Sequence, residues 1–466
     1  WSTVSANVRH DPVPGTACSE GAYVVPPYVI KHVDGAKIAL LGFTTDRGPQ
    51  VVGSAVTDGL CFLSSVPGSS GIPDVSEVEA ELRAQVRKLR NEEGVDIIVM
   101  LSELGLANNS LLAQRNDGID VILSADMHEE TAQAVVVTTP NGGMTILAEE
   151  GQDGTMLGEL EIKIDTRRNR ISKWEWKAHT INSSIRENKL ISKKVAEVRQ
   201  PFVTGSFVPH TNPFNGSILS TPIDSVIGET DVALHRSNFS HEDMPGAIEG
   251  TSHGFLTDAF RNVAGTDIGA IRGFRYGTHL APGIVKLEDI YHYLPIGPII
   301  ARGSIPGQAV KNQIENPADG AFNPDPRRWT GGWLFGFSGV TFDLDLYQPN
   351  GQRASNIMVN GVPLDTTRRY SYASYWYAND PGLINRIAST NIELAVRGDD
   401  GRALFVPIAD AANYPAMDGT EVVWQYLRDN LGGRLSSLQT HRVNLLTPLP
   451  APVFGNYEVQ PLRGVQ

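Results

Sequence analysis

The chain has 466 residues, of which 41% are hydrophobic and 20% are charged, and it contains 46 glycines and 29 prolines. This is the composition of an ordinary globular protein with many loops, and at roughly 150 residues per domain the length predicts about two to three domains. The formal net charge of -13 repels phosphate backbones, and the sequence shows no basic patch, so nucleic acid is not an expected partner. No apolar stretch approaches the roughly 20 residues that cross a bilayer, so no transmembrane segment is expected.

The chain begins at Trp1 rather than at a methionine. We therefore expect a leader or a larger segment upstream in the full protein, and a periplasmic or extracellular location. The two cysteines, Cys18 and Cys61, either form one disulfide in an oxidising compartment or remain free thiols. Their spacing does not decide between these two states.

The first half of the chain predicts an alternation of strands and helices. Residues 37–45 form a strand-like apolar run, and residues 75–91 carry apolar side chains at helical spacing. Residues 97–101 and 119–123 have the length and β-branched content of parallel strands that are buried on both faces. Residues 134–178 then hold four short β-like runs separated by turn residues, which predicts antiparallel pairing. The pattern favours an α/β fold with a parallel or mixed sheet.

Acidic residues follow the two buried strands of this half. Glu103 comes just after the first strand, and Asp126 and His128 come just after the second. In open α/β sheets, ligands bind beyond the carboxyl ends of the strands. Glu103, Asp126 and His128 are therefore the candidate metal ligands.

The residue types at this edge suit a divalent cation. Carboxylate oxygens favour hard ions such as Mg²⁺, Mn²⁺ or Ca²⁺, whereas an imidazole also suits Zn²⁺. Two carboxylates about 4 Å apart repel by roughly 4 kcal/mol at an effective dielectric near 20, and a bound cation would relieve that repulsion. The alternative is that these acids are solvated loop residues. The acids that we expect at the same edge are Glu129, Glu130, Glu149, Glu150 and Asp153.

The second half begins after a segment that we interpret as a linker. Residues 188–200 show a helical pattern and lead into a loop-rich passage, residues 201–231. This passage separates a first domain, residues 1–200, from a second, residues 232–466. Helices are expected at 254–264, 287–293, 307–315 and 421–430, and strands at 268–271, 340–346, 357–359 and 370–375.

Several short motifs carry a resemblance to a known superfamily. In the first half they are Ser5-Ala6-Asn7-Val8, Leu101-Ser102-x-Leu104-Gly105, Gly118 to Ile122, and Gly154-x-x-Leu157-Gly158. This half resembles the metallophosphoesterase domain of the 5'-nucleotidase superfamily, which implies an αββα sandwich. In the second half they are residues 251–261, 273–278 and 321–326. This half resembles the α/β C-terminal domain of the same superfamily, and most closely its SoxB-type sulfate thiohydrolase branch.

The chain departs from the superfamily at two places. Members begin with Asp-x-His, Gly-Asp and Gly-Asn-His blocks, which supply most ligands of a two-metal centre, and none of these precedes Ser5 here. We therefore expect that the first domain lacks its first strands, and that an upstream segment or another chain completes it. Members also have histidines at two positions where this sequence has Glu103 and Asp126, and only His128 matches.

The resemblance also implies residues for a small anionic substrate. Arg275 matches the anion-binding arginine of the superfamily, and a guanidinium suits bidentate binding of phosphate or sulfate. Gly273 and Thr278 belong to the same motif. Phe335, Phe337 and Trp376 fall where nucleotidases place the rings that sandwich a base, although aromatic residues beside strands are more often core residues.

Three functions fit the sequence. The first is a metal-dependent hydrolase that cleaves a nucleotide-like phosphate ester with metal-activated water. The second is a SoxB-like hydrolase that releases sulfate from a sulfur carrier. The third is a non-catalytic binding or structural descendant, because a fold does not fix a function. We favour the first, since the histidines are replaced by acids and not by inert residues.

Overall fold

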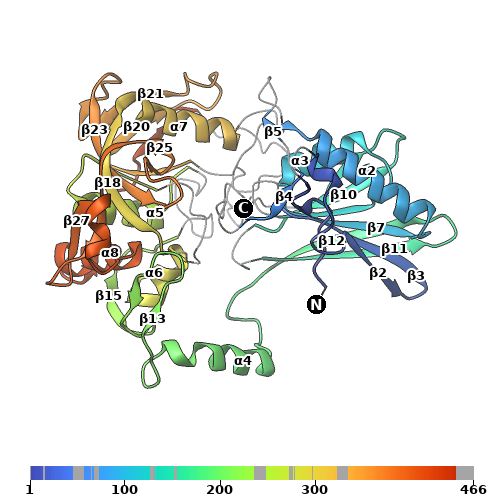
Figure 1. The fold of residues 1–466 in the computed structure, drawn as a ribbon, viewed down its shortest axis with the longest axis horizontal. Coiled ribbons are helices and arrows are strands. Elements are labelled where there is room, and N and C mark those ends of the chain that lie inside the picture. The colour runs from blue at the N-terminus through green and yellow to red at the C-terminus, as the bar shows by residue number, and fades with distance from the viewer. Residues whose placement is uncertain are drawn as a thin grey trace. The chain divides into compact units, whose positions relative to one another are not determined.

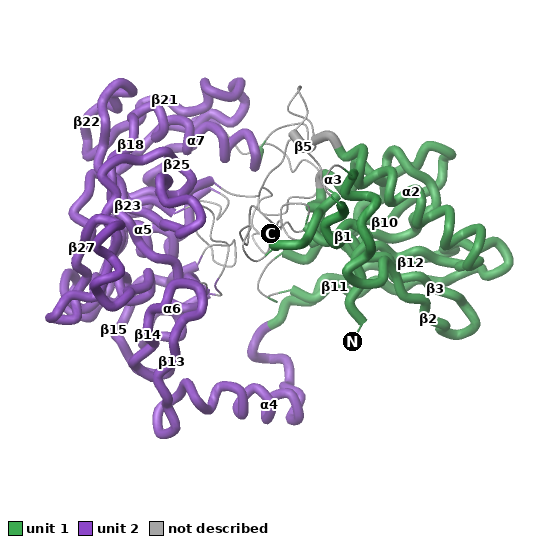
Figure 2. The backbone as a smooth tube through the Cα atoms, viewed as in Figure 1, with its two compact units in different colours: residues 1–181, 322–332, 452–457 green, residues 182–321, 333–451, 458–466 purple. Residues whose placement is uncertain are grey.

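The computed structural model describes residues 2–13, 16–45, 57–63, 66–67, 73–125, 131, 133–151, 154, 156–235, 248–271, 277, 279–295, 297–322 and 334–447. These residues divide into two compact units, shown in green and purple in Figure 2. The chain crosses from the first unit to the second between Ile181 and Asn182. The domain limits 1–200 and 232–466 stay predictions.

The first unit is built on one mixed sheet of six strands (Figure 1). In spatial order these are β2 (Tyr28–Val33), β3 (Ala36–Phe43), β7 (Ile97–Ser102), β8 (Val121–Ser124), β10 (Met144–Ala148) and β9 (Val135–Thr138). The four central strands run parallel, and β2 and β9 pair antiparallel at the two edges. The predicted mixed α/β sheet is therefore confirmed.

Alternating side chains of this sheet enter two different cores, because successive residues of a strand point to opposite faces. Ile98 and Met100 of β7 pack in a cluster with α2 (Ser76–Asn91) and α3 (Leu106–Arg115). Ile97 and Val99 pack on the opposite face with side chains of β11 (Met156–Asp165) and β12 (Arg170–Thr180). Helices thus cover one face of the sheet, and an antiparallel hairpin covers the other.

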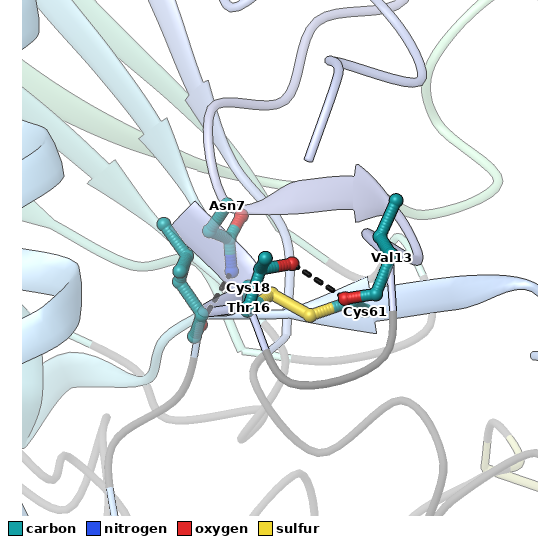
Figure 3. Close-up of a disulfide and its surroundings, with 6 residues drawn as sticks. Asn7, Val13, Thr16, Cys18 and Cys61 are labelled. Carbon is teal, nitrogen blue, oxygen red and sulfur yellow. Dashed lines mark hydrogen bonds between the residues drawn. A yellow bond between two sulfur atoms is a disulfide. The ribbon is translucent and has the colours of Figure 1, made fainter. Parts of the chain in front are cut away.

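A disulfide closes a loop at the start of the first unit. Cys18 and Cys61 are bonded, with their Cα atoms 5.8 Å apart (Figure 3). Cys18 begins the short 3-10 helix Cys18–Glu20, and Cys61 lies in β4 (Leu60–Phe62), which pairs antiparallel with β1 (Val8–His10). The structure therefore decides the pairing that the sequence left open. A further small ladder joins β5 (Val66–Pro67) and β6 (Pro73–Asp74).

The second unit holds a second sheet of six strands. In spatial order these are β19 (Gly336–Ser338), β16 (Ile268–Ile271), β23 (Arg369–Trp376), β18 (Ile299–Pro306), β26 (Thr390–Arg397) and β27 (Ala403–Pro407). Only β16 and β23 are parallel neighbours in it. Apolar side chains of α5 (Thr251–Ala264), α6 (Leu287–Tyr293) and α8 (Gly419–Gln425) form one core cluster with residues of this sheet.

Two smaller sheets complete the second unit. One joins β17 (Gly283–Lys286), β15 (Val226–Thr230) and β28 (Arg434–Leu435), and the other joins β22 (Val362–Pro363), β21 (Ala354–Val359), β20 (Val340–Leu344) and β29 (Val443–Leu445). Helix α7 (Gly307–Phe322) continues beyond the predicted end at Glu315 and includes Pro317. A proline removes one helical hydrogen bond, which is why the sequence pattern predicted an earlier end.

The passage that the sequence predicts as a linker contains regular structure. It follows α4 (Lys189–Arg199) and holds β13 (His210–Thr211), β14 (Ile218–Leu219) and β15. Strand β15 pairs with β28, which lies far along the chain, so no local pattern could reveal it. The remaining elements are the short pair β24 (Leu383–Ile384) and β25 (Ile387–Ala388), the 3-10 helices Gln200–Phe202 and Ile408–Asn413, and the π-helical turn Tyr426–Asn430. Among the described residues, no helix is long and apolar enough to cross a membrane.

Candidate functional site

The carboxyl ends of the parallel strands meet at one edge of the first unit's sheet. Phe43 at the end of β3 pairs with Ser102 at the end of β7, and Ser102 pairs with Ser124 at the end of β8. The last residue of β10, Ala148, pairs with Leu123. The residues that follow these ends, which include Glu103, therefore lie along the edge where ligands bind in open α/β sheets.

Glu103 is held at this edge by the last residue of β3 and by the two residues that follow it. Its backbone N–H donates to Phe43 O over 2.9 Å, and its Oε2 accepts hydrogen bonds from Thr44 Oγ1 at 2.6 Å and from Thr45 N at 3.3 Å. The side chain is exposed. Gly105 follows with φ 82 and ψ 154, a backbone conformation that is essentially restricted to glycine, and it turns the chain into α3. Glu103 thus presents a fixed and accessible carboxylate.

The other two predicted ligands, Asp126 and His128, lie outside the described residues, as do Glu129, Glu130 and Asp153. Glu149 is described and its side chain is buried. Among the described residues, no group of three or more His, Cys, Asp or Glu side chains is placed to hold a metal ion. The described part of the edge therefore fits one oxygen ligand of a divalent cation, Glu103, and the remaining ligands stay predictions.

A chain of buried polar side chains runs beneath this edge, and sequence reasoning did not find it. Ser102 Oγ donates to Asn109 Oδ1 at 2.7 Å, and Asn109 Nδ2 donates to Ser124 Oγ at 2.9 Å. Ser124 Oγ in turn donates to Glu149 Oε2 at 2.6 Å. We call Ser102, Asn109, Ser124 and Glu149 the strand-end relay. The sequence feature that could have indicated this relay is the serine at the last position of both β7 and β8.

The predicted anion-binding residues of the second unit, Gly273, Arg275 and Thr278, lie outside the described residues. Strand β16 ends at Ile271, just before them, and pairs with Gly336 of β19. His279, which follows Thr278, is exposed and stacks on the buried His235 with ring centroids 5.8 Å apart. The assignment of Arg275 as the anion-binding residue stays a prediction.

The three aromatic residues predicted to hold a base differ in their exposure. Phe335 is partly exposed, whereas Phe337 and Trp376 are 5% and 7% exposed. The Phe337 ring packs edge-on against Phe342 at 6.3 Å, and Trp376 Nε1 donates to Pro381 O at 3.1 Å. Phe337 and Trp376 thus take part in the packing of the second unit, and base stacking stays a prediction.

A small cavity lies at the start of α5. It measures about 20 Å³ and is lined by Glu249, His253, Phe335, Phe337 and Arg442, among others. This volume suits about one water molecule and is too small for a nucleobase. Arg442 is buried and donates to Phe337 O at 2.6 Å and to Asp258 Oδ2 at 2.7 Å, so it joins β19 to α5. No sequence motif pointed to Arg442 or Glu249.

The buried carboxyl of Glu249 makes the stability of the folded protein depend on pH. Burial raises the pKa of its carboxyl above the ordinary 4.5, although hydrogen bonds from Val443 N and Arg442 N and the charge of Arg442 act in the opposite direction. The folded protein therefore binds this proton more tightly than the unfolded chain. The contribution of Glu249 to the free energy of unfolding is fully present below the pKa of its carboxyl in the unfolded chain. It is lost as the pH rises through the pKa of this carboxyl in the folded protein.

We expect Glu249→Gln, which cannot ionise, to gain thermal stability relative to the natural protein as the pH rises from about 4 to about 8. The measurement is the difference between the two melting temperatures at each pH. The raised pKa of Glu249 would be contradicted if the melting temperature of Glu249→Gln minus that of the natural protein stayed constant or fell with rising pH.

The second unit matches a known protein family. The family model of the 5'-nucleotidase C-terminal domain matches residues 226–383. This match spans β15 to β24 and includes α5, α6, α7 and the strands around the cavity. The predicted resemblance of the second half to the 5'-nucleotidase C-terminal domain is therefore confirmed, and the SoxB-type branch stays a prediction.

Curated relatives align with most of the chain. The chain is 22% identical over 416 residues to the trifunctional nucleotide phosphoesterase YfkN of Bacillus subtilis. This alignment covers 88% of the chain and 25% of YfkN. It is 23% identical to the NAD 5'-nucleotidase of Haemophilus influenzae, which covers 84% of this chain and 66% of that protein. The chain thus spans less than two thirds of the length of these relatives.

Solved structures show the same fold. The sulfate thiohydrolase SoxB of Thermus thermophilus aligns with a TM-score of 0.69 and 20% identity over 95% of this chain and 68% of SoxB. A 5'-nucleotidase precursor from Thermus thermophilus aligns with a TM-score of 0.66 and 18% identity over 96% of this chain and 78% of that one. Both units are included in these alignments, so the two-domain architecture is shared. The second unit therefore carries a 5'-nucleotidase C-terminal domain, and the chain has the two-domain fold of these solved structures.

Proposed function

We propose that the protein is a metal-dependent hydrolase that cleaves a nucleotide-like phosphate ester. The observation that carries the proposal is Glu103, whose carboxylate is fixed by Thr44 and Thr45 at the carboxyl edge of the parallel strands. This is the position at which members of the superfamily have a metal-binding histidine. A carboxylate in that position can still coordinate a cation, whereas an apolar side chain could not.

Glu103, Asp126 and His128 would hold the metal. A bound divalent cation would lower the pKa of a water molecule and polarise the phosphoryl oxygens. The oxygen donors favour Mn²⁺, Mg²⁺ or Ca²⁺, and His128 makes Zn²⁺ a fourth choice. The chain itself would fix Glu103 through Thr44 and Thr45, so that this ligand needs no reorientation when the cation arrives.

The second unit would supply recognition of the substrate. Arg275, with Gly273 and Thr278, would bind the anionic group, because a guanidinium forms two parallel hydrogen bonds with phosphate. Phe335, Phe337 and Trp376 would contact the organic part. YfkN and the NAD 5'-nucleotidase, whose names include nucleotide substrates, support a nucleotide-like ester.

The Cys18–Cys61 disulfide supports a periplasmic or extracellular location, because disulfides persist in oxidising compartments. Relatives that include venom 5'-nucleotidases agree with this location.

The test compares Glu103→Gln with a matched control, Glu159→Gln, after dialysis against a chelator. Glu159 is an exposed carboxylate on β11 that accepts a hydrogen bond from His179. We expect the natural protein to bind Mn²⁺ in titration calorimetry and to hydrolyse a nucleoside monophosphate only when Mn²⁺ is added back. Glu103→Gln should weaken both by about 10- to 100-fold, and Glu159→Gln should change neither.

The alternatives predict different results. Release of sulfate from a thiosulfonate conjugate, without turnover of phosphate esters, would replace the proposal by a SoxB-like activity. Absence of turnover together with absence of Mn²⁺ binding would leave a non-catalytic descendant. Equal metal affinity in Glu103→Gln and the natural protein would remove Glu103 from the ligand set.

A further inference from the structure

The strand-end relay connects three neighbouring parallel strands of the first unit. Ser102 ends β7, Ser124 ends β8, and Glu149 follows the end of β10, while Asn109 lies in α3 between the two serines. All four side chains are at most 9% exposed. The relay thus crosses the sheet just beneath the edge on which Glu103 lies.

The hydrogen bonds of the relay have a definite direction. At one end of the relay, Ser124 Oγ donates to Glu149 Oε2. The same Ser124 oxygen accepts from Asn109 Nδ2, and the Asn109 oxygen accepts from Ser102 Oγ. Every side chain thus has a partner, and a fully satisfied buried network makes a structure rigid.

Glu149 acts on both sides of the segment that carries Asp126 and His128. On one side its carboxylate holds Ser124, and Ala125 N donates to Ser102 O at 2.8 Å. On the other side Thr131 N donates to Glu149 O at 2.8 Å, and Glu149 N donates to Thr131 Oγ1 at 3.1 Å. Thr131 is fully buried. Glu149 therefore bonds to a described residue on each side of this segment, to Ser124 through its carboxyl and to Thr131 through its backbone.

The relay also reaches the strand end that carries Glu103. Ser102 precedes Glu103 directly, and its Oγ accepts from Leu104 N at 3.3 Å while it donates to Asn109. The residues on both sides of Glu103 are thus tied to the relay. Apolar side chains of similar volume would fill the space under the edge, but they would not fix the spacing of three strand ends by directional bonds.

We propose that Glu149, acting through Ser124, Asn109 and Ser102, is a positioning residue for the metal-binding edge. This inference rests on the proposed function, because it assigns the relay the task of holding the ligand-bearing strand ends at a fixed spacing. By fixing the spacing of the strand ends that carry the ligands, the relay sets the affinity of this edge for the cation.

The test uses two variants of the relay and one control. Ser124→Ala removes the hydroxyl that joins Asn109 to Glu149, and Glu149→Gln keeps the shape but replaces one carboxyl oxygen by an amide nitrogen. The control is Asp120→Asn. Asp120 is a partly buried carboxylate directly before β8, at the opposite end of that strand, where it accepts from Ile98 N at 2.8 Å and pairs with Arg90.

Three measurements are made on each full-length variant. These are the melting temperature, the Mn²⁺ affinity by titration calorimetry, and amide hydrogen exchange of peptides that cover residues 102–104 and 131–133. We expect both relay variants to weaken Mn²⁺ binding by about 10- to 100-fold and to speed exchange in these peptides. Asp120→Asn should lower the melting temperature without either change.

The outcomes separate this inference from the function on which it rests. No Mn²⁺ binding by the natural protein would overturn both. Mn²⁺ binding by the natural protein, with equal losses of affinity in Ser124→Ala and Asp120→Asn, would overturn the positioning role alone, because affinity would then follow stability. Unchanged exchange in both relay variants would overturn it as well. If Ser124→Ala fails to fold, Glu149→Gln decides by the same three measurements.

Discussion

Replacing Arg442 by methionine is expected to destabilise the second unit by about 3–5 kcal/mol. Arg442 is 4% exposed, and its guanidinium pairs with Asp258 and donates to Phe337 O. Methionine would fill similar space, but it would leave the partly buried Asp258 carboxylate without its cation. Most of the loss comes from this uncompensated charge, since removing one partner of a buried ion pair costs more than the pair contributes.

The matched control is Arg434→Met, which removes an arginine with two carboxylate partners from the surface of the same unit. Arg434 pairs with Glu229 and Asp231, and its side chain is 54% exposed. We expect a much smaller loss than for Arg442→Met, because water screens exposed pairs. Calorimetric unfolding of both variants gives the comparison. Similar losses in the two would show that burial of Arg442 does not control the energetics of its ion pair.

Removing the disulfide by replacing Cys18 and Cys61 with serine is expected to cost the first unit about 4 kcal/mol. The two residues are 43 positions apart, and the estimate is the entropy that the bridge removes from the unfolded chain by closing a loop of that length. Denaturant unfolding of the first unit would measure the loss. The unfolded natural protein should show no reactive thiol until a reductant is added.

A useful control for the disulfide lies just before Cys18, outside the loop that the bridge closes. Thr16 Oγ1 donates to Val13 O at 2.7 Å in an exposed turn (Figure 3). Thr16→Ala removes this bond without opening the loop, and an exposed substitution of this kind changes stability by about 0.5 kcal/mol or less. A loss of less than about 1 kcal/mol in the double serine variant would contradict the loop-closure argument.

The local patterns of the sequence were sufficient for the main elements of the first unit. The apolar runs that become β7 and β8, and the helical spacing that becomes α2, depend on neighbours a few residues apart. The position of Glu103 after β7 followed from the same local reasoning. In the second unit, α5 and β16 were predicted for the same reason, and β15 was not, because its partner β28 is distant in sequence.

By itself, the sequence determined the α/β class, the order of the main strands and helices, and the 5'-nucleotidase C-terminal domain of the second half, since these depend on local periodicity and on short motifs. Only the tertiary structure decided the Cys18–Cys61 pairing, the burial of Arg442 and the relay from Ser102 to Glu149. Each of these joins residues from separate elements. Such contacts form only when the elements pack, and burial then determines which polar side chains must find a partner.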